Sequence, residues 1–196
     1  MKVNEIFYSL QGEGLYSGTP AVFVRFSGCN LKCPFCDTRH EGGDEMSEEE
    51  IVAAVVRHPA RLVVITGGEP SLQLTESLVE ALHAAHKTVA VETNGTHLLP
   101  PNVDWVTLSP KTVYVDGAEV VLTRADEIKV VFDGEHDPAD QISSLTFHLP
   151  PFIFLQPCDM GDNAKNKQIT AAAVEYIKSH PQWRLSLQIH KILNIQ

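Results

Sequence analysis

Three of the four cysteines of this chain lie within one short stretch, spaced C-x3-C-x2-C, as Cys29, Cys33 and Cys36. The stretch directly follows the apolar run from Ala21 to Phe26, which is typical of a buried strand. A strand points successive side chains to opposite faces, so three sulfurs can converge on one centre only from a loop. Gly28 and Pro34 favour a loop because they permit or impose backbone angles that regular elements avoid. The sequence therefore predicts a buried strand that ends in a thiol-bearing loop.

Thiolates are the usual ligands of iron–sulfur clusters, and three of them leave the fourth iron of a cube without a protein ligand. An open coordination position separates a reactive metal site from a structural one. Zinc is the alternative on spacing alone, because His40 is available as a fourth ligand beside the three cysteines. A disulfide framework is less favoured, since the N-terminus does not resemble a signal peptide and a trio leaves one thiol over.

The length and the charge balance narrow the functional classes. A chain of 196 residues is large enough for a sizeable core, and we expect a single domain over residues 1–196. No apolar run approaches the length of a membrane-spanning helix. Fifteen basic and twenty-five acidic residues give a net charge of -10, which argues against a broad nucleic-acid-binding surface. Four cysteines without secretion features indicate a reducing, cytoplasmic location.

Strand-like and helix-like segments alternate along the chain. Apolar runs predict an initial strand or turn over residues 1–9 and core strands over 21–26, 61–65, 88–91, 105–108, 127–132 and 152–155. Helical patterns cover a segment that begins at Ser47 with a capping box to Glu50, and the segments 72–85 and 170–179; residues 137–145 are a further candidate turn. The apolar face of the first helix consists of Ile51, Val52, Val55 and Val56. Such alternation indicates a parallel sheet, whose ligands bind at the carboxyl ends of the strands.

Two further polar features have both functional and structural interpretations. Leu10 to Gly14 contains Gln11 and Glu13 between glycines, which suits close approach of a ligand but is also typical of a surface turn. Arg25 interrupts an apolar strand and is costly to bury alone. It either bridges a carboxylate of the core or binds the carboxylate of a ligand.

The strand over 61–65 ends in Thr66-Gly67-Gly68-Glu69-Pro70. With the cysteine loop, this stretch resembles the GGE motif of the radical S-adenosylmethionine (radical SAM) enzymes. The resemblance implies an α/β fold, a partial (βα)6 radical SAM barrel with reduced helix content, about six parallel strands and three main helices. It also implies that Cys29, Cys33 and Cys36 hold a 4Fe-4S cluster, that SAM chelates the open iron, and that the GGE turn receives the SAM amino group.

A finer resemblance, to the 7-carboxy-7-deazaguanine synthase family, covers nearly the whole chain. It is carried by residues 9–14, the strand with Arg25, residues 36–38, 66–70 and 109–111, the Gln156-Pro157 corner and residues 187–191. The resemblance implies conversion of 6-carboxy-5,6,7,8-tetrahydropterin to 7-carboxy-7-deazaguanine and ammonia, in queuosine biosynthesis, with SAM, the cluster and Mg²⁺. An activase of a glycyl-radical enzyme, which shares the cysteine spacing and the GGE turn but needs a protein partner, is the alternative.

The same resemblance assigns site residues. It implies a cluster loop over 28–40, Mg²⁺ at Thr38 and a C-terminal tail, residues 185–196, that closes the substrate site. The residues expected around SAM are Phe35, Asp37, Gly68, Glu69, Ser109, Pro110, Lys111, Gln156, Pro157, Cys158 and Asp159. Those expected at the substrate are Gln11, Gly12, Glu13, Arg25, Thr66 and Gln196, the last through its terminal carboxylate. The expected partners are the pterin, an electron donor such as flavodoxin, and a second copy in a homodimer.

The fourth cysteine departs from the family's pattern. Cys158 follows Gln-Pro, where relatives often carry methionine, and it is distant in sequence from the other three. We interpret it as a small packing residue, because a fourth thiolate would close the open iron. His40, His58, His83, His86 and His97 are expected to be mostly solvated or capping residues.

Overall fold

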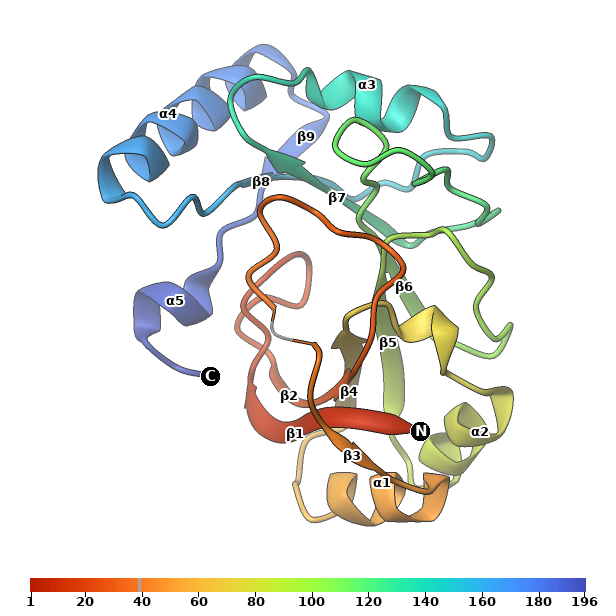
Figure 1. The fold of residues 1–196 in the computed structure, drawn as a ribbon. Coiled ribbons are helices and arrows are strands. Elements are labelled where there is room, and N and C mark those ends of the chain that lie inside the picture. The colour runs from red at the N-terminus through yellow and green to blue at the C-terminus, as the bar shows by residue number, and fades with distance from the viewer. Residues whose placement is uncertain (39) are drawn as a thin grey trace.

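One curved, nine-stranded sheet organises the protein (Figure 1). The structure is a computed structural model, which describes residues 1–38 and 40–196. The sheet order is β3-β1-β2-β4-β5-β6-β7-β8-β9. The strands are β1 (Lys2–Leu10), β2 (Pro20–Phe26), β3 (Asp44–Glu45), β4 (Leu62–Gly67), β5 (Thr88–Thr93), β6 (Trp105–Leu108), β7 (Glu127–Phe132), β8 (Ile153–Pro157) and β9 (Trp183–Leu185).

All neighbours from β2 to β9 run parallel, whereas β1 and β3 pair antiparallel at one edge. The six predicted core strands and the initial strand are confirmed, as is the α/β class. The strands β3 and β9 were not predicted, because two or three residues are too few to show an alternating pattern.

Five α-helices and one 3-10 turn lie between or after the strands in the part of the chain that the structure describes. They are α1 (Glu48–Val55), a 3-10 turn η1 (Pro70–Leu72), α2 (Glu76–Ala84), α3 (Pro138–Ser143), α4 (Asn163–Ser179) and α5 (Ile189–Leu193). The candidate turn over 137–145 is therefore helical. The predicted start of α4 at Thr170 is wrong: the helix begins seven residues earlier, where the Asp162 side chain accepts hydrogen bonds from the Ala164 and Lys165 amides. The polar composition of those first turns hides them from an apolar periodicity.

The capping box at α1 forms as predicted, with Ser47 and Glu50 each bonded to the other's backbone amide. Ile51 and Val55 are buried, but Val56 is 49% exposed. Val56 is the C-cap of the helix rather than part of its inner face, so its prediction as a core residue is wrong.

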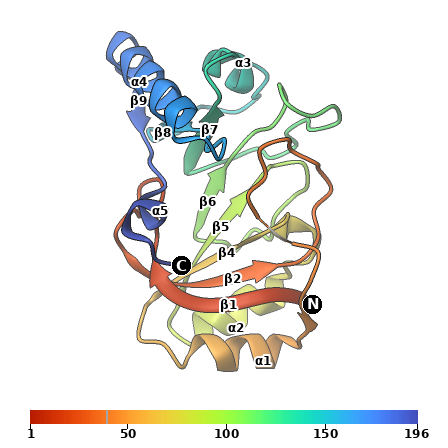
Figure 2. The same cartoon turned by 60° about the vertical axis from the view of Figure 1, so that its left-hand side comes forward.

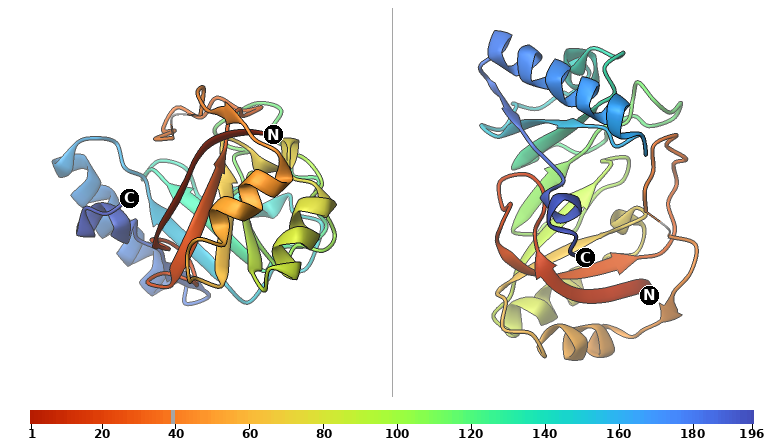
Figure 3. Two further views of the ribbon diagram at one scale, coloured as in Figure 1. Left: turned by 90° about the horizontal axis from the view of Figure 1, so that it is seen from below. Right: turned by 90° about the vertical axis from the view of Figure 1, so that its left-hand side faces the viewer.

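The two faces of the sheet carry different residues because side chains alternate along each strand. On one face, Val24, Ile65 and Val130 belong to the main core with residues of α1, α2 and α4. On the other face, Phe23, Val64 and their neighbours form a smaller cluster towards the amino ends of the strands. Figure 3 shows α1, α2 and α4 on the outer side of the curved sheet. The inner face is left for a site.

The C-terminal segment lies beside the first strand (Figures 2 and 3). The Ser9 hydroxyl donates to the Gln196 backbone oxygen at 2.5 Å, and the Ile189 amide donates to the Gly12 carbonyl at 3.1 Å. These contacts join the two edges of the sheet. Among the described residues, no helix has the length and apolar character needed to cross a membrane.

Candidate active site

The inner face of the sheet is polar near the carboxyl ends of its strands. Arg25 on β2 is in register with Thr66 on β4, and both alternate with core residues. Glu92 on β5, Lys129 on β7 and Gln156 on β8 point to the same face. They line a cavity of about 550 Å³. The parallel sheet thus gathers these side chains at the edge where ligand sites are expected.

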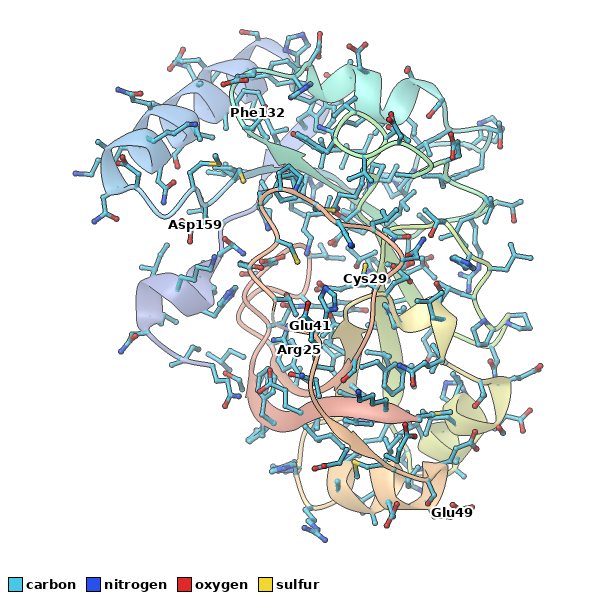
Figure 4. The ribbon with its side chains drawn as sticks, viewed as in Figure 1. Arg25, Cys29, Glu41, Glu49, Phe132 and Asp159 are labelled. Carbon is cyan, nitrogen blue, oxygen red and sulfur yellow. The ribbon has the colours of Figure 1, made fainter. Side chains whose placement is uncertain are left out.

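The three cysteines line this cavity in the loop that follows β2. None of them is in a disulfide; Cys29 and Cys33 are half-buried, and Cys36 is exposed. Burial raises the pKa of the Cys29 and Cys33 thiols, while Lys111 opposes the rise at Cys33. Figure 4 shows Cys29 near the centre of the molecule, above Arg25. Three free thiols open to one cavity fit the donor set of an iron–sulfur cluster with one iron left open.

Zinc was the alternative occupant of this loop. Among the described residues, no three His, Cys, Asp or Glu side chains gather closely enough to hold a single metal ion. The described part of the loop therefore shows no preformed single-ion site. Cys158 is buried at 5% exposure, also lines the cavity, and has a pKa raised to about 11, chiefly by burial.

The GGE turn is locked against the start of the cysteine loop by backbone contacts. The Gly68 amide donates to the Phe26 carbonyl at 3.0 Å, and the Glu69 amide donates to the Gly28 carbonyl at 2.8 Å. A Cβ atom on Gly68 would collide with that Gly28 oxygen, and one on Gly67 would collide with the Phe26 backbone. The glycines are therefore required by the close approach of two backbones. Turn and loop form one unit.

Glu69 is 1% exposed and its carboxylate is used inside the protein. It accepts hydrogen bonds from the Thr93 hydroxyl at 2.7 Å, the Asn94 amide at 2.7 Å and the Ser71 amide at 3.0 Å. The Asn94 side chain in turn donates to Asn30 in the cysteine loop at 3.1 Å. Glu69 thus ties the turn to the end of β5, and its expected contact with SAM stays a prediction.

A buried charge cluster forms the opposite wall of the cavity. The Lys129 ammonium binds the Glu13 carboxylate and lies 3.3 Å from Glu92. Gln11 donates to Glu92 at 2.9 Å, and Gln188 donates to Glu13 at 2.9 Å. Burial raises the pKa of Glu13, but the Lys129 charge and these hydrogen bonds outweigh it and lower the pKa to about 2. Burial lowers the pKa of Lys129, but Glu13 and Glu92 raise it above its usual value.

The C-terminal segment closes the side of the cavity. Lys191 pairs with Asp37 at 2.7 Å and with Asp159 at 2.8 Å, and Gln188 lies 3.4 Å from Asp37. Lys191 and further hydrogen bonds hold the pKa of Asp159 well below its usual range. Figure 4 shows Asp159 on the side of the molecule where α5 lies. This segment therefore links the cysteine loop, the end of β8 and the Gln11–Glu13 loop.

Arg25 lies at the cavity and has a carboxylate partner within the protein. Its Nε donates to Glu5 at 2.7 Å, and Glu5 also accepts from the Gln196 side chain at 2.8 Å. Arg25 was expected to pair either with a carboxylate of the protein or with that of a ligand, and the structure shows a protein carboxylate, Glu5 on β1. Among the described residues, no partner is found for its two terminal nitrogens, which suit a ligand carboxylate.

Nearly all the predicted site residues are brought together. The cavity is lined by Cys29, Cys33, Cys36, Thr38, Phe35, Asp37, Gly68, Glu69, Ser109, Lys111, Gln156, Pro157, Cys158, Asp159, Gln11, Gly12, Glu13, Arg25, Thr66 and Gln196. Pro110 is not among the lining residues; it is buried between two that are. Lys111 donates to Ser109 at 2.5 Å, and burial lowers its pKa to about 8.

Sequence reasoning gave no individual role at the site to Glu5, Glu92, Lys129 or Gln188, although Gln188 lies in the tail that was expected to close it. Glu92 and Lys129 could have been found, because each is a charged residue at an alternate position of an otherwise apolar strand. Glu5 and Gln188 carried no comparable signal, since each lies in a short segment of mixed apolar and polar residues.

Comparison with known proteins agrees with this geometry. A sequence model described as the Radical SAM superfamily matches residues 23–140. A relative from Bacteroides thetaiotaomicron named 7-carboxy-7-deazaguanine synthase is 51% identical, and the match covers 100% of this chain and 98% of the relative. A relative of the same name from Bordetella pertussis is 43% identical, and the match covers 98% of both chains. The crystal structure of QueE from Escherichia coli has a TM-score of 0.79 and 33% identity, covering 95% of this chain and 92% of that one. This chain therefore belongs to the radical SAM superfamily and, within it, to the 7-carboxy-7-deazaguanine synthase family.

Proposed function

We propose that this protein contracts the ring of 6-carboxy-5,6,7,8-tetrahydropterin to give 7-carboxy-7-deazaguanine and ammonia, a step of queuosine biosynthesis. The observation that carries the proposal is that one cavity holds both the three-cysteine loop and a polar wall suited to a carboxylated, N–H-rich ring. Full-length similarity to proteins named for this product supports it. We treat residues 1–196 as a single radical SAM domain.

Cys29, Cys33 and Cys36 would hold the 4Fe-4S cluster, and the GGE turn with its neighbours would hold SAM. When bound, the pair would supply the radical chemistry that activates a C–H bond of the substrate. The residues of the chain orient the substrate and exclude water. Phe35 lies against Tyr114, with ring centroids 4.7 Å apart, and so offers an apolar edge at the cavity.

The polar wall would recognise the substrate at three points. The terminal nitrogens of Arg25 would bind its carboxylate, and Thr66, in register beside Arg25, would bond the ring nearby. Glu13 would accept two hydrogen bonds from the amidine-like N–H pair of the pterin, because a carboxylate has two acceptor oxygens. Gln196 would contribute from the rim of the cavity. The tail, residues 185–196, would then close over the substrate.

Magnesium would be held by Thr38 together with substrate oxygens. Mg²⁺ takes hard oxygen ligands and usually keeps several from water or substrate, so one protein hydroxyl suits a site completed by a ligand. Thr38 lines the cavity two residues beyond Cys36, which supports this role. The electron donor, such as flavodoxin, and the homodimer stay predictions.

The reaction itself is the main test. Anaerobic incubation with SAM, dithionite, Mg²⁺ and the tetrahydropterin should give the deazaguanine product, detected by mass spectrometry. Arg25→Ala should lose product while retaining its iron. Unchanged turnover by that variant would show that Arg25 does not bind the substrate carboxylate.

Metal analysis separates the cluster from zinc. Cys33→Ala should lose most of its iron and sulfide, whereas Cys158→Ala, a matched change of a buried thiol in the same cavity, should retain both. Zinc at one per chain without sulfide would contradict the radical mechanism. The activase alternative requires radical transfer to a peptide; product from the pterin together with no such transfer would exclude it.

A further inference from the structure

Lys129 is buried in the middle of a parallel strand, where a lysine is costly unless its charge is paired. Its side chain is 6% exposed, and its neighbours on β7, Ile128 and Val130, are fully buried. The ammonium contacts two carboxylates, Glu13 and Glu92, which come from different parts of the chain. An apolar side chain would fill this space without the cost of burying a charge, so we expect the ammonium of Lys129 to have a specific role.

The surroundings of Glu13 explain that charge. Glu92 and Glu127 face it from β5 and β7, and Lys111 faces it from the loop after β6. His190 lies against Gly12, and the Gln188 side chain links Glu13 to Asp37 by contacting both carboxylates. Two carboxylates that share one centre cannot both ionise readily without a cation between them. Lys129 is the cation that lies between Glu13 and Glu92.

The protonation state of Glu13 decides what it can recognise. An ionised carboxylate only accepts hydrogen bonds and therefore fits the paired N–H donors of a 2-aminopyrimidinone edge. A protonated carboxyl carries its own donor, which would oppose those of the ring. We propose that Lys129 is a positioning residue that keeps Glu13 ionised and aimed into the cavity, and so sets the preference for a ligand with a 2-amino donor edge. This inference rests on the proposed function and deepens it.

The direction of the pKa shifts agrees with this geometry. Although burial raises the pKa of Glu13, the charge and the hydrogen bond of Lys129 lower it to about 2. Glu127, which is further from the ammonium and lacks this pairing, has a pKa raised by burial to about 7. Of these two carboxylates, Glu13 is the one bonded to Lys129, and that ammonium is the largest of the causes that lower its pKa.

Binding of the tetrahydropterin itself tests the proposal. Calorimetry would be carried out anaerobically on the reconstituted protein with SAM, between about pH 6.5 and about pH 8.5. Lys129→Met should raise Kd about tenfold or more relative to wild type at the lower pH, because Glu13 then holds a proton. The ratio of the two Kd values should shrink as the pH rises and Glu13 ionises. Lys129→Arg, which keeps the charge, should restore most of the affinity.

A ligand comparison and a control sharpen the result. An analogue without the 2-amino group should bind wild type much more weakly than the substrate, and Lys129→Met should reduce that discrimination. Lys178→Met is the matched control, since Lys178 pairs with Glu175 on the exposed surface of α4; its Kd should equal that of wild type. Equal Kd values for Lys129→Met and wild type at every pH would overturn the proposal.

A readout independent of binding separates this inference from the proposed function. The carbon NMR signal of the Glu13 carboxylate, assigned by its loss in Glu13→Gln, should stay ionised in wild type down to about pH 5 and titrate near neutral pH in Lys129→Met. If wild type fails to bind the pterin, the proposed function fails while this titration still decides the role of Lys129. If Lys129→Met does not fold, a wild-type Glu13 signal that titrates above about pH 5 overturns the proposal.

Discussion

The two walls of the cavity are held by different forces. On the wall formed by the GGE turn and the cysteine loop, backbone amides bond backbone carbonyls, and Gly68 lies so close to Gly28 that no side chain fits between them. On the wall formed by Glu13, Lys129 and Glu92, side-chain charges are paired across strands that are distant in sequence. The first wall is fixed by shape and the second by electrostatics.

This difference has a chemical consequence. A wall fixed by backbone contacts keeps its form when pH or salt changes, which suits the place where a cluster and SAM would bind. A wall fixed by charges responds to pH and to the charge of its ligand. Under the proposed function, the rigid wall would place the cofactors, and the charged wall would recognise the substrate.

The largest effect is expected on the rigid wall. Gly68→Ala should lower the free energy of unfolding by about 3 kcal/mol or more, because its Cβ meets a backbone carbonyl that cannot move alone. Urea denaturation would measure the loss. Gly42→Ala is the control, since its Cβ would be in ordinary contact, 3.6 Å from the Asn4 side chain, and should change stability by about 0.5 kcal/mol at most. A similar small effect at Gly68 would show that the wall is not fixed by shape.

Glu69→Gln should lower the free energy of unfolding by about 2 kcal/mol, because the amide cannot accept all the hydrogen bonds that the buried carboxylate receives. Glu48→Gln offers a comparison on the surface side of the molecule, where the carboxylate accepts from Thr75 and Ser77. That change should cost well under half as much. Equal losses in thermal denaturation at the two positions would contradict the role of Glu69 as the buried tie between the turn and β5.

Glu127→Gln tests the pH response of the charged wall. Burial raises the pKa of Glu127 to about 7, although the Leu15 amide, which donates to it at 2.7 Å, opposes the rise. The folded state therefore holds a proton that the unfolded state releases above about pH 4.5, so wild-type stability falls as the pH rises towards 7. The variant should be more stable than wild type by about 1–2 kcal/mol at about pH 8 and equal to it at about pH 4. Parallel stability curves for the two proteins would contradict this assignment.

The smallest effect is expected at the exposed end of the charged wall. Lys191→Met should lower the free energy of unfolding by only about 0.5 kcal/mol near neutral pH. The reason is that 35% of the Lys191 side-chain surface is exposed, so water screens its pairs with Asp37 and Asp159. Because Lys191 and other hydrogen bonds lower the pKa of Asp159, its pair contributes above the usual aspartate pKa and loses that contribution as the pH falls towards the lowered pKa. Thermal denaturation at low and high salt should show the cost vanishing at high salt. A cost that is large and independent of salt would place Lys191 with the rigid wall.

The same contrast explains what could be predicted from the sequence. Close backbone approach requires glycine, so the GGE turn and the cysteine loop are visible as local motifs, and the core strands are visible as apolar runs. The pairing of Glu13 with Lys129 joins residues 116 positions apart and depends on the register of the strands, which no local pattern shows. For the same reason Arg25 was expected to meet a carboxylate, but Glu5 was not identified as that partner.

The junction between the sheet edges has a consequence for how the molecule is made. The contact between Ser9 and Gln196 joins residues 187 positions apart, so a large loop-closure entropy opposes it and it forms late in folding. Until it forms, the cysteine loop and the GGE turn can fold while the side of their cavity is still open. The enclosure that the cofactors would need is therefore completed after the parts that would hold them.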